Sequence, residues 1–200
     1  MSNIVPTIDD LDTHPVSLSV WELQVLDTLL ALDNEWTVYV KPMIAWHQPS
    51  FIAAHPRHGV CVIEAKGWAV GSRRVAANGV MEHHDGTQWL PTADEPCHQV
   101  DLAKRAVAMQ FFGGIDRIDP TLVRGVVIMT QYSTNDACSL LRGAQGSDAK
   151  NRIKVWGGHA LADDPLCVLT GHPRPAHHDV SPLALQRLHR HCLQHDRFAG

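Results

Sequence analysis

A glutamate and a lysine two positions apart, at the end of an apolar run, carry the clearest chemical signal in this sequence. Residues 60 to 63 are Val, Cys, Val and Ile, which is typical of a strand covered on both faces. Side chains alternate along a strand, so Glu64 and Lys66 are expected on one face of it. Burying either charge alone costs on the order of several kcal/mol. The two side chains are therefore expected to be paired, solvated at the end of the sheet, or used with a metal ion and a substrate.

The turn before this strand determines which residue lies opposite Glu64. Residues 55 to 59 have the proline and glycine of a tight turn, and a loop of this length pairs Ala54 with Val60. The same register places Ser50 opposite Glu64. An acidic residue there would complete a two-carboxylate site for a divalent cation, with the neighbouring lysine holding the attacking water or stabilising phosphate charge. The serine hydroxyl offers only a neutral ligand.

Two expected helices each carry a polar side chain inside an apolar face. Residues 17 to 33 have apolar residues at spacings of three and four, and Glu22 falls in the middle of that apolar arc. A second helix is expected from Pro96 to about residue 112, with Gln99 in the same situation. Glu22 could reach water from the first turn, and Gln99 could face solvent or cap the backbone. Alternatively, both project toward the end of the sheet, where Glu64 is expected.

Three short motifs around this hairpin resemble those of a known nuclease family. Pro49 and Phe51 flank position 50, His-Pro-x-x-Gly-Val begins at His55, and Ile-Glu-x-Lys-Gly-Trp begins at Ile63. Over about residues 18 to 130 the chain resembles the nuclease-related domain (NERD) family of the PD-(D/E)xK nucleases. The resemblance implies a restriction-endonuclease-like α/β fold, in which a central mixed β-sheet is flanked by helices. It also implies hydrolysis of DNA phosphodiester bonds with Mg²⁺ or Mn²⁺.

The resemblance also implies a set of metal ligands. Glu64 and the backbone carbonyl of Ala65 would hold the ion. The family pattern has a metal-binding aspartate where this chain has Ser50, so the resemblance implies weak metal binding if the serine is native.

Further roles follow from the same resemblance. Lys66 would orient or activate the attacking water. Glu22 matches a glutamate on the family's first helix, and Gln99 matches a Pro-x-x-Gln motif that follows the last hairpin. Both would act as outer ligands or position the lysine. Members of the family often precede DNA helicases, which implies a helicase or another subunit of a multi-protein system as partner.

Three functional hypotheses are open at this point. The chain is a metal-dependent deoxyribonuclease, or a nuclease-like domain that has lost metal chemistry and binds DNA or docks onto a protein, or an active nuclease into which Ser50 was substituted. The chain has no Gly-x-x-x-x-Gly-Lys motif, so it is not itself the motor of a helicase. The sequence does not specify an oligomeric state.

Contacts to nucleic acid must come from a local patch, because the formal net charge is −4. Lys150, Arg152 and Lys154 alternate along one side of a potential strand and could contact phosphates. The alternative is an exposed edge strand that its charges protect from pairing. Trp68, directly after the central strand, is a further candidate for contact with nucleic acid.

The remaining segments complete an α/β order of elements. Strands are expected over residues 36–41 and 123–130, with the second helix as the crossover to the latter. Short strands between residues 69 and 90 are expected to extend the sheet antiparallel to the hairpin. We expect a core domain over 17–132, an N-terminal extension over 1–16 and a C-terminal extension over 133–200 that packs on the core.

The sequence indicates a cytoplasmic protein without a membrane segment. Its N-terminus is polar, unlike a signal peptide, and it has no apolar run of 18 residues. Five widely spaced cysteines indicate reduced thiols. The last helix is expected from Pro182 to about Arg197. His191 and His195 could bind zinc there, although a histidine-rich helix end is the simpler explanation.

Overall fold

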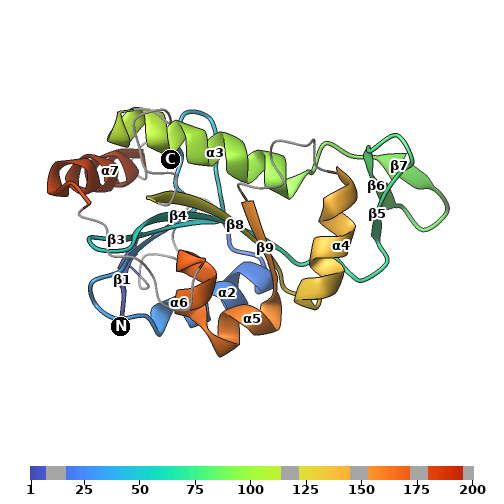
Figure 1. The fold of residues 1–200 in the computed structure, drawn as a ribbon, viewed down its shortest axis with the longest axis horizontal. Coiled ribbons are helices and arrows are strands. Elements are labelled where there is room, and N and C mark those ends of the chain that lie inside the picture. The colour runs from blue at the N-terminus through green and yellow to red at the C-terminus, as the bar shows by residue number, and fades with distance from the viewer. Residues whose placement is uncertain (8–16, 114–121, 145–152, 172–179, 196–200) are drawn as a thin grey trace.

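Six strands form one mixed sheet through the middle of the molecule (Figure 1). The structure is a computed structural model that describes residues 1–7, 17–113, 122–144, 153–171 and 180–195. The strands lie in the order β1 (Asn3–Val5), β2 (Thr37–Val40), β3 (Phe51–His55), β4 (Gly59–Lys66), β8 (Val123–Met129) and β9 (Ile153–Gly157). β3 is antiparallel to β2 and β4, whereas the other neighbouring pairs are parallel. The expected α/β fold with a central mixed sheet flanked by helices is confirmed.

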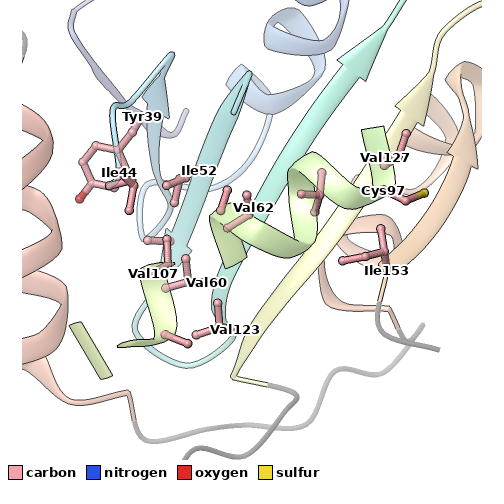
Figure 2. Close-up of a cluster of buried hydrophobic side chains, with 14 of the residues drawn as sticks. Tyr39, Ile44, Ile52, Val60, Val62, Cys97, Val107, Val123, Val127 and Ile153 are labelled. Atoms are coloured by element: carbon pink, nitrogen blue, oxygen red, sulfur yellow. The ribbon is translucent and has the colours of Figure 1, made fainter. Parts of the chain in front are cut away.

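Helices cover both faces of this sheet, as Figure 1 shows. One face carries α3 (Pro96–Phe112) and α7 (Pro182–His195), and the other carries α2 (Val20–Leu30), α5 (Gly158–Asp163) and α6 (Pro165–Thr170). The alternation along the strands explains the two layers. Ile52 and Val62 pack in the cluster under α3 (Figure 2), whereas Phe51 and Ile63 pack in the cluster under α2.

The central hairpin has the register that its turn predicts. Ala54 pairs with Val60 and Phe51 pairs with Ile63. α3 then crosses over the sheet, and β8 pairs in parallel with the other edge of β4. Both edges and both faces of β4 are therefore occupied.

The short strands after Trp68 do not extend the central sheet, so this expectation is wrong. β5 (Arg73–Val75), β6 (Met81–His84) and β7 (Trp89–Pro91) form a separate three-stranded sheet that projects from one end of the molecule (Figure 1). The physical reason is that the hairpin has no free edge, because β2 already pairs with β3 and β8 already pairs with β4. These strands therefore pair with one another.

The sheet also takes strands from outside residues 17–132. β1 lies in the expected N-terminal extension, and β9 lies in the expected C-terminal one. Between β8 and β9 the chain forms α4 (Thr134–Ala144), a helix that the polar composition of this region did not predict. Ser133 accepts a hydrogen bond from the Asp136 N–H and donates one to the Asp136 carboxylate, which stabilises the start of this helix.

Two further expectations concern the membrane and the thiols. Within the described segments, each helix is too short or too polar to cross a bilayer. The five cysteines, all within the described residues, are not joined in disulfides, as expected.

Candidate active site

The predicted catalytic strand ends in a cluster of charged side chains. Lys66 Nζ lies 3.0 Å from Glu64 Oε1 and 2.7 Å from Asp94 Oδ1. Gln99, in the first turn of α3, donates from Nε2 to the same Asp94 oxygen at 3.4 Å. The side chains of Glu64 and Lys66 are only 12% and 16% exposed. The lysine therefore joins two carboxylates, one from β4 and one from the segment before α3.

Lys66 is held in its protonated form. Burial alone would lower the pKa of its ammonium, but the charges of Glu64 and Asp94 and their hydrogen bonds outweigh burial and raise it above the ordinary 10.5. An ammonium cannot accept a proton from water. Of the roles expected for Lys66, orienting water or stabilising negative charge is therefore favoured over acting as a general base.

Ser50 connects this cluster to α2. Its hydroxyl donates to Glu22 Oε1 at 2.8 Å and accepts the Ala65 N–H at 3.2 Å. Its own N–H donates to Glu64 Oε2 at 3.1 Å. This contact places Ser50 opposite Glu64, as the hairpin register predicts. The serine is 1% exposed and its polar groups are engaged with the protein.

The backbone of Ala65 faces Ser50. Its N–H points to Ser50 at the β3 edge, and in a strand the carbonyl of a residue projects from the same edge as its N–H. The carbonyl of the next residue, Lys66, points the other way and accepts from Thr130 after β8. The Ala65 carbonyl thus faces the Ser50 side, where the sequence predicted a metal ligand.

Glu22 is only 6% exposed, so it does not reach out to water, and its two carboxylate oxygens have different partners. It closes a capping box at the start of α2, because Ser19 N–H donates to Glu22 Oε2 at 3.0 Å and Ser19 Oγ accepts the Glu22 N–H. Its other carboxylate oxygen accepts from Ser50 and pairs with Lys41. Burial raises the pKa of Glu22, but the hydrogen bonds from Lys41, Ser19 and Ser50 outweigh it and leave the pKa lowered.

Sequence reasoning missed two charged residues of this cluster, Lys41 and Asp94. Lys41 ends the apolar run of β2 much as Glu64 ends that of β4, and this signal could have been used. Asp94 lies in the loop two residues before Pro96, where its N–H donates to Thr92 Oγ1. A loop carboxylate of this kind has no periodicity that would single it out in the sequence.

A pocket of about 300 Å³ opens beside the cluster. Glu64, Lys66 and Gln99 form its polar wall, and Leu102 and Ala103 of α3 add apolar surface. The loop of residues 46–49 completes the lining. Glu22 does not line this pocket and is connected to Glu64 through Ser50.

The loop between β2 and β3 has an unusual backbone at the rim of the pocket. Ile44 and His47 exchange two backbone hydrogen bonds, of 2.8 and 2.9 Å, across Ala45 and Trp46. Ala45 and Trp46 have φ values of 46° and 73°, as in a type I′ turn. Such values cost a non-glycine residue roughly 1–2 kcal/mol each. Ile44, fully buried against Tyr39, anchors the turn (Figure 2).

The residues that were expected to contact nucleic acid lie in different parts of the chain and do not form one surface in the described structure. Lys154 is exposed on β9, an edge strand of the sheet, which agrees with a charged and protected edge. Lys150 and Arg152 lie outside the described residues. Trp68 is 9% exposed and belongs to the core cluster, and the Arg73 guanidinium covers its ring at 4.9 Å. Its ring therefore offers little surface for stacking.

A second group of side chains has a spacing that could hold a metal ion. The ligand atoms of Asp33, Glu35 and His55 lie within 4.8 Å of one another, the two acids exposed and the histidine buried. However, His55 Nδ1 accepts the backbone N–H groups of Arg57 and His58, at 3.0 and 3.2 Å. The neutral ring must then carry its proton on Nε2, which faces Glu35 at 3.4 Å. This tautomer opposes metal binding through Nε2.

The histidines of α7 have contacts within the protein. His191 places Nε2 3.1 Å from the Met43 carbonyl and Nδ1 3.3 Å from the Gln110 amide. His189 Nδ1 lies 3.2 Å from the Tyr39 hydroxyl. The side chain of His195 lies outside the described residues. The described contacts join α7 to α3 and β2, and they favour a structural role over zinc binding.

No protein-family model matches the chain, and no curated protein or solved structure matches it either.

Proposed function

We propose that this chain is a NERD-type, divalent-metal-dependent deoxyribonuclease with a restriction-endonuclease-like core, working alongside a helicase or another DNA-processing subunit. One observation carries the proposal. A continuous chain of contacts at one end of the sheet joins Glu22, Ser50, Glu64, Lys66 and Gln99, with Asp94 of the loop before α3 as the link between Lys66 and Gln99.

The donor set fits a hard divalent cation. Glu64 Oε1 contacts the Lys66 ammonium, so Oε2, on the Ser50 side, is the carboxylate oxygen that would hold the ion. The Ser50 hydroxyl and the Ala65 carbonyl add neutral oxygens, and oxygen ligands are what Mg²⁺ and Mn²⁺ prefer. When bound, the ion would polarise the phosphodiester and lower the pKa of water.

The formal charge of the cluster supports a requirement for such an ion. Glu22, Glu64 and Asp94 outnumber Lys41 and Lys66, which leaves one excess negative charge. An anionic phosphodiester is repelled by this balance at short range. A bound divalent cation would make the net charge of the cluster positive.

Lys66 has the contacts of a group that stabilises charge. An ammonium has three N–H donors, and among the described residues two of these are directed at Glu64 and Asp94. The third is available for a phosphate oxygen or the attacking water. Gln99 holds Asp94 in place and thereby positions the lysine.

A second function is favoured by the contacts of Ser50. Because its hydroxyl and its N–H are engaged by Glu22, Ala65 and Glu64, the serine is well placed to stabilise the fold without metal. This favours a catalytically impaired nuclease-like domain that binds DNA or docks onto a protein. The two functions differ in whether the native chain cleaves DNA.

A cleavage assay with Mg²⁺ or Mn²⁺ on single- and double-stranded DNA distinguishes them, with Ser50→Asp for comparison. We expect slow metal-dependent cleavage by the native chain and faster cleavage by Ser50→Asp. The aspartate would crowd Glu22 and Glu64, so this variant should melt at a lower temperature in EDTA and recover with Mn²⁺. Absence of cleavage by both chains, with the variant folded and bound to Mn²⁺, would favour the binding module.

A further inference from the structure

Trp46 has the most exposed large apolar side chain in the described part of the chain. Its side chain is 95% exposed. This exposure is unexpected, because an indole presents more apolar area to water than any other side chain of this protein. It is also one of the residues that line the pocket beside Glu64 and Lys66. The exposed Trp46 side chain therefore lies at the candidate active site.

Trp46 also has an unusual backbone conformation. Ala45 and Trp46 occupy the two left-handed positions of the tight turn, which asparagine and glycine fill at lower cost. The two backbone hydrogen bonds between Ile44 and His47, together with the buried Ile44 side chain, hold the turn in place. Strain retained at an exposed tryptophan points to a functional role.

The lining of the pocket contains two chemical kinds of side chain. Lys66, Glu64 and Gln99 provide charge and hydrogen bonds, whereas Trp46 and Leu102 provide apolar surface. A nucleotide has the same division, with an anionic phosphate and a flat base. The pocket, of about 300 Å³, lies at the lower end of the roughly 300–1,000 Å³ of small-ligand sites and fits one such group.

We propose that Trp46 is a stacking platform for an unpaired nucleobase next to the phosphate that Lys66 contacts. This inference rests on the proposed function and adds a substrate class to it. Bases inside a duplex are covered by their neighbours on both faces, so a ring at this position selects single strands, overhangs or frayed ends. The ionic wall beside the ring favours nucleic acid over an apolar protein partner.

Binding to fluorescent oligonucleotides with nuclease-resistant phosphorothioate linkages, measured in Mn²⁺ so that the cluster does not repel the backbone, tests the platform. Trp46→Ala should weaken binding to a single strand by roughly 5- to 100-fold, the range found for loss of one base–aromatic stack. Trp46→Phe should keep most of the affinity. Blunt duplex should bind all three proteins equally within about twofold. Met109→Ala, which truncates another exposed apolar side chain, is the matched control.

An oligonucleotide with one abasic position identifies the stacked base. The native chain should lose affinity for it when the missing base is the one that stacks, and Trp46→Ala should lose nothing further. Trp46→Gly relieves the left-handed strain, so it should melt at or above the native temperature while binding as weakly as Trp46→Ala. A loss of affinity in that variant cannot be assigned to unfolding.

Equal single-strand affinity of the native chain and Trp46→Ala would overturn the inference, and would leave a protein partner as the occupant of this surface. An equal loss for single strand and duplex would overturn it as well. The cleavage assay distinguishes a failure of the nuclease proposal from a failure of the stacking proposal. Stacking without cleavage refutes the nuclease alone, and cleavage unaffected by Trp46→Ala refutes the platform alone.

Discussion

At the scale of single residues, the contacts of Lys66 separate an enzyme from a binding module. Its ammonium is held between Glu64 and Asp94, so it can stabilise charge that develops on a phosphate. In a nuclease, Lys66→Ala should reduce single-turnover cleavage at least ~100-fold and change DNA affinity only a few-fold. Lys154→Ala removes the same charge from the exposed edge strand and should leave the cleavage step unchanged.

Two results would contradict this role of Lys66. One is full metal-dependent cleavage by a folded Lys66→Ala chain. The other is an equal loss of cleavage in Lys154→Ala under saturating protein, which would indicate a general charge effect. Thermal unfolding of each variant must be measured first, because Lys66 also neutralises Glu64.

Glu22 should make the stability of the fold depend on pH. Burial opposes its charge, yet the hydrogen bonds from Lys41, Ser19 and Ser50 lower the pKa of Glu22 below its ordinary 4.5. A lowered pKa means that Glu22 contributes stability above pH about 4.5, and that this contribution is lost as pH falls through the lower folded value. Glu22→Gln should therefore cost stability at pH 7 and much less once the pH is below the lowered pKa of Glu22.

The measurement is the free energy of unfolding of both chains by urea across this pH range. A difference between native and Glu22→Gln that stays constant from pH 7 to pH 3 would show that the ionised carboxylate adds nothing to its neutral hydrogen bonds.

At the scale of elements, Gly67 determines how closely α2 approaches the end of β4. A Cβ at this position would lie 1.7 Å from the Trp21 ring, the residue before Glu22. Gly67→Ala should therefore displace Trp21 and destabilise the fold by about 1–3 kcal/mol. In a Trp21→Ala background the same change should cost much less, and a double-mutant cycle of unfolding free energies measures that difference. Equal costs in both backgrounds would exclude the clash as the cause.

The elements differ in how far local sequence determines them. The hairpin register was predicted because a tight turn and the alternation of side chains are local properties. The position of β5 to β7 was not, because it depends on which strand edges remain open in the folded sheet. α4 was missed since its Ser, Asn and Asp composition resembles a loop, although Ser133 and Asp136 are a recognisable helix start.

The residues of the candidate active site also differ in how far local sequence determines their positions. Glu22, Ser50, Glu64 and Gln99 could be predicted to converge because strand pleat and helical phase set their directions. Asp94 comes from a loop, and only the folded chain brings it to Lys66. The left-handed turn at Trp46 has neither glycine nor asparagine, so its sequence contains no signal for that backbone.

At the scale of the whole molecule, the sheet depends on both ends of the chain. β9 pairs with β8, and Leu161, Val168 and Leu169 from α5 and α6 are almost fully buried in the cluster on the α2 face. A chain ending at residue 132 loses these contacts and should not unfold cooperatively. A chain ending at residue 195 retains every described element and should melt like the full protein. Calorimetry of the two truncations makes the comparison, and a sharp native-like transition of the shorter chain would refute the dependence.

The double-sided pairing of β4 has a consequence for how this protein opens. A strand bonded along both edges and buried on both faces exchanges its amide hydrogens only when the whole molecule unfolds. Glu64 and Lys66 lie at the end of this strand, which we expect to be among the slowest to exchange. Fluctuations of the projecting β5–β7 sheet can therefore proceed while the two charges keep their spacing.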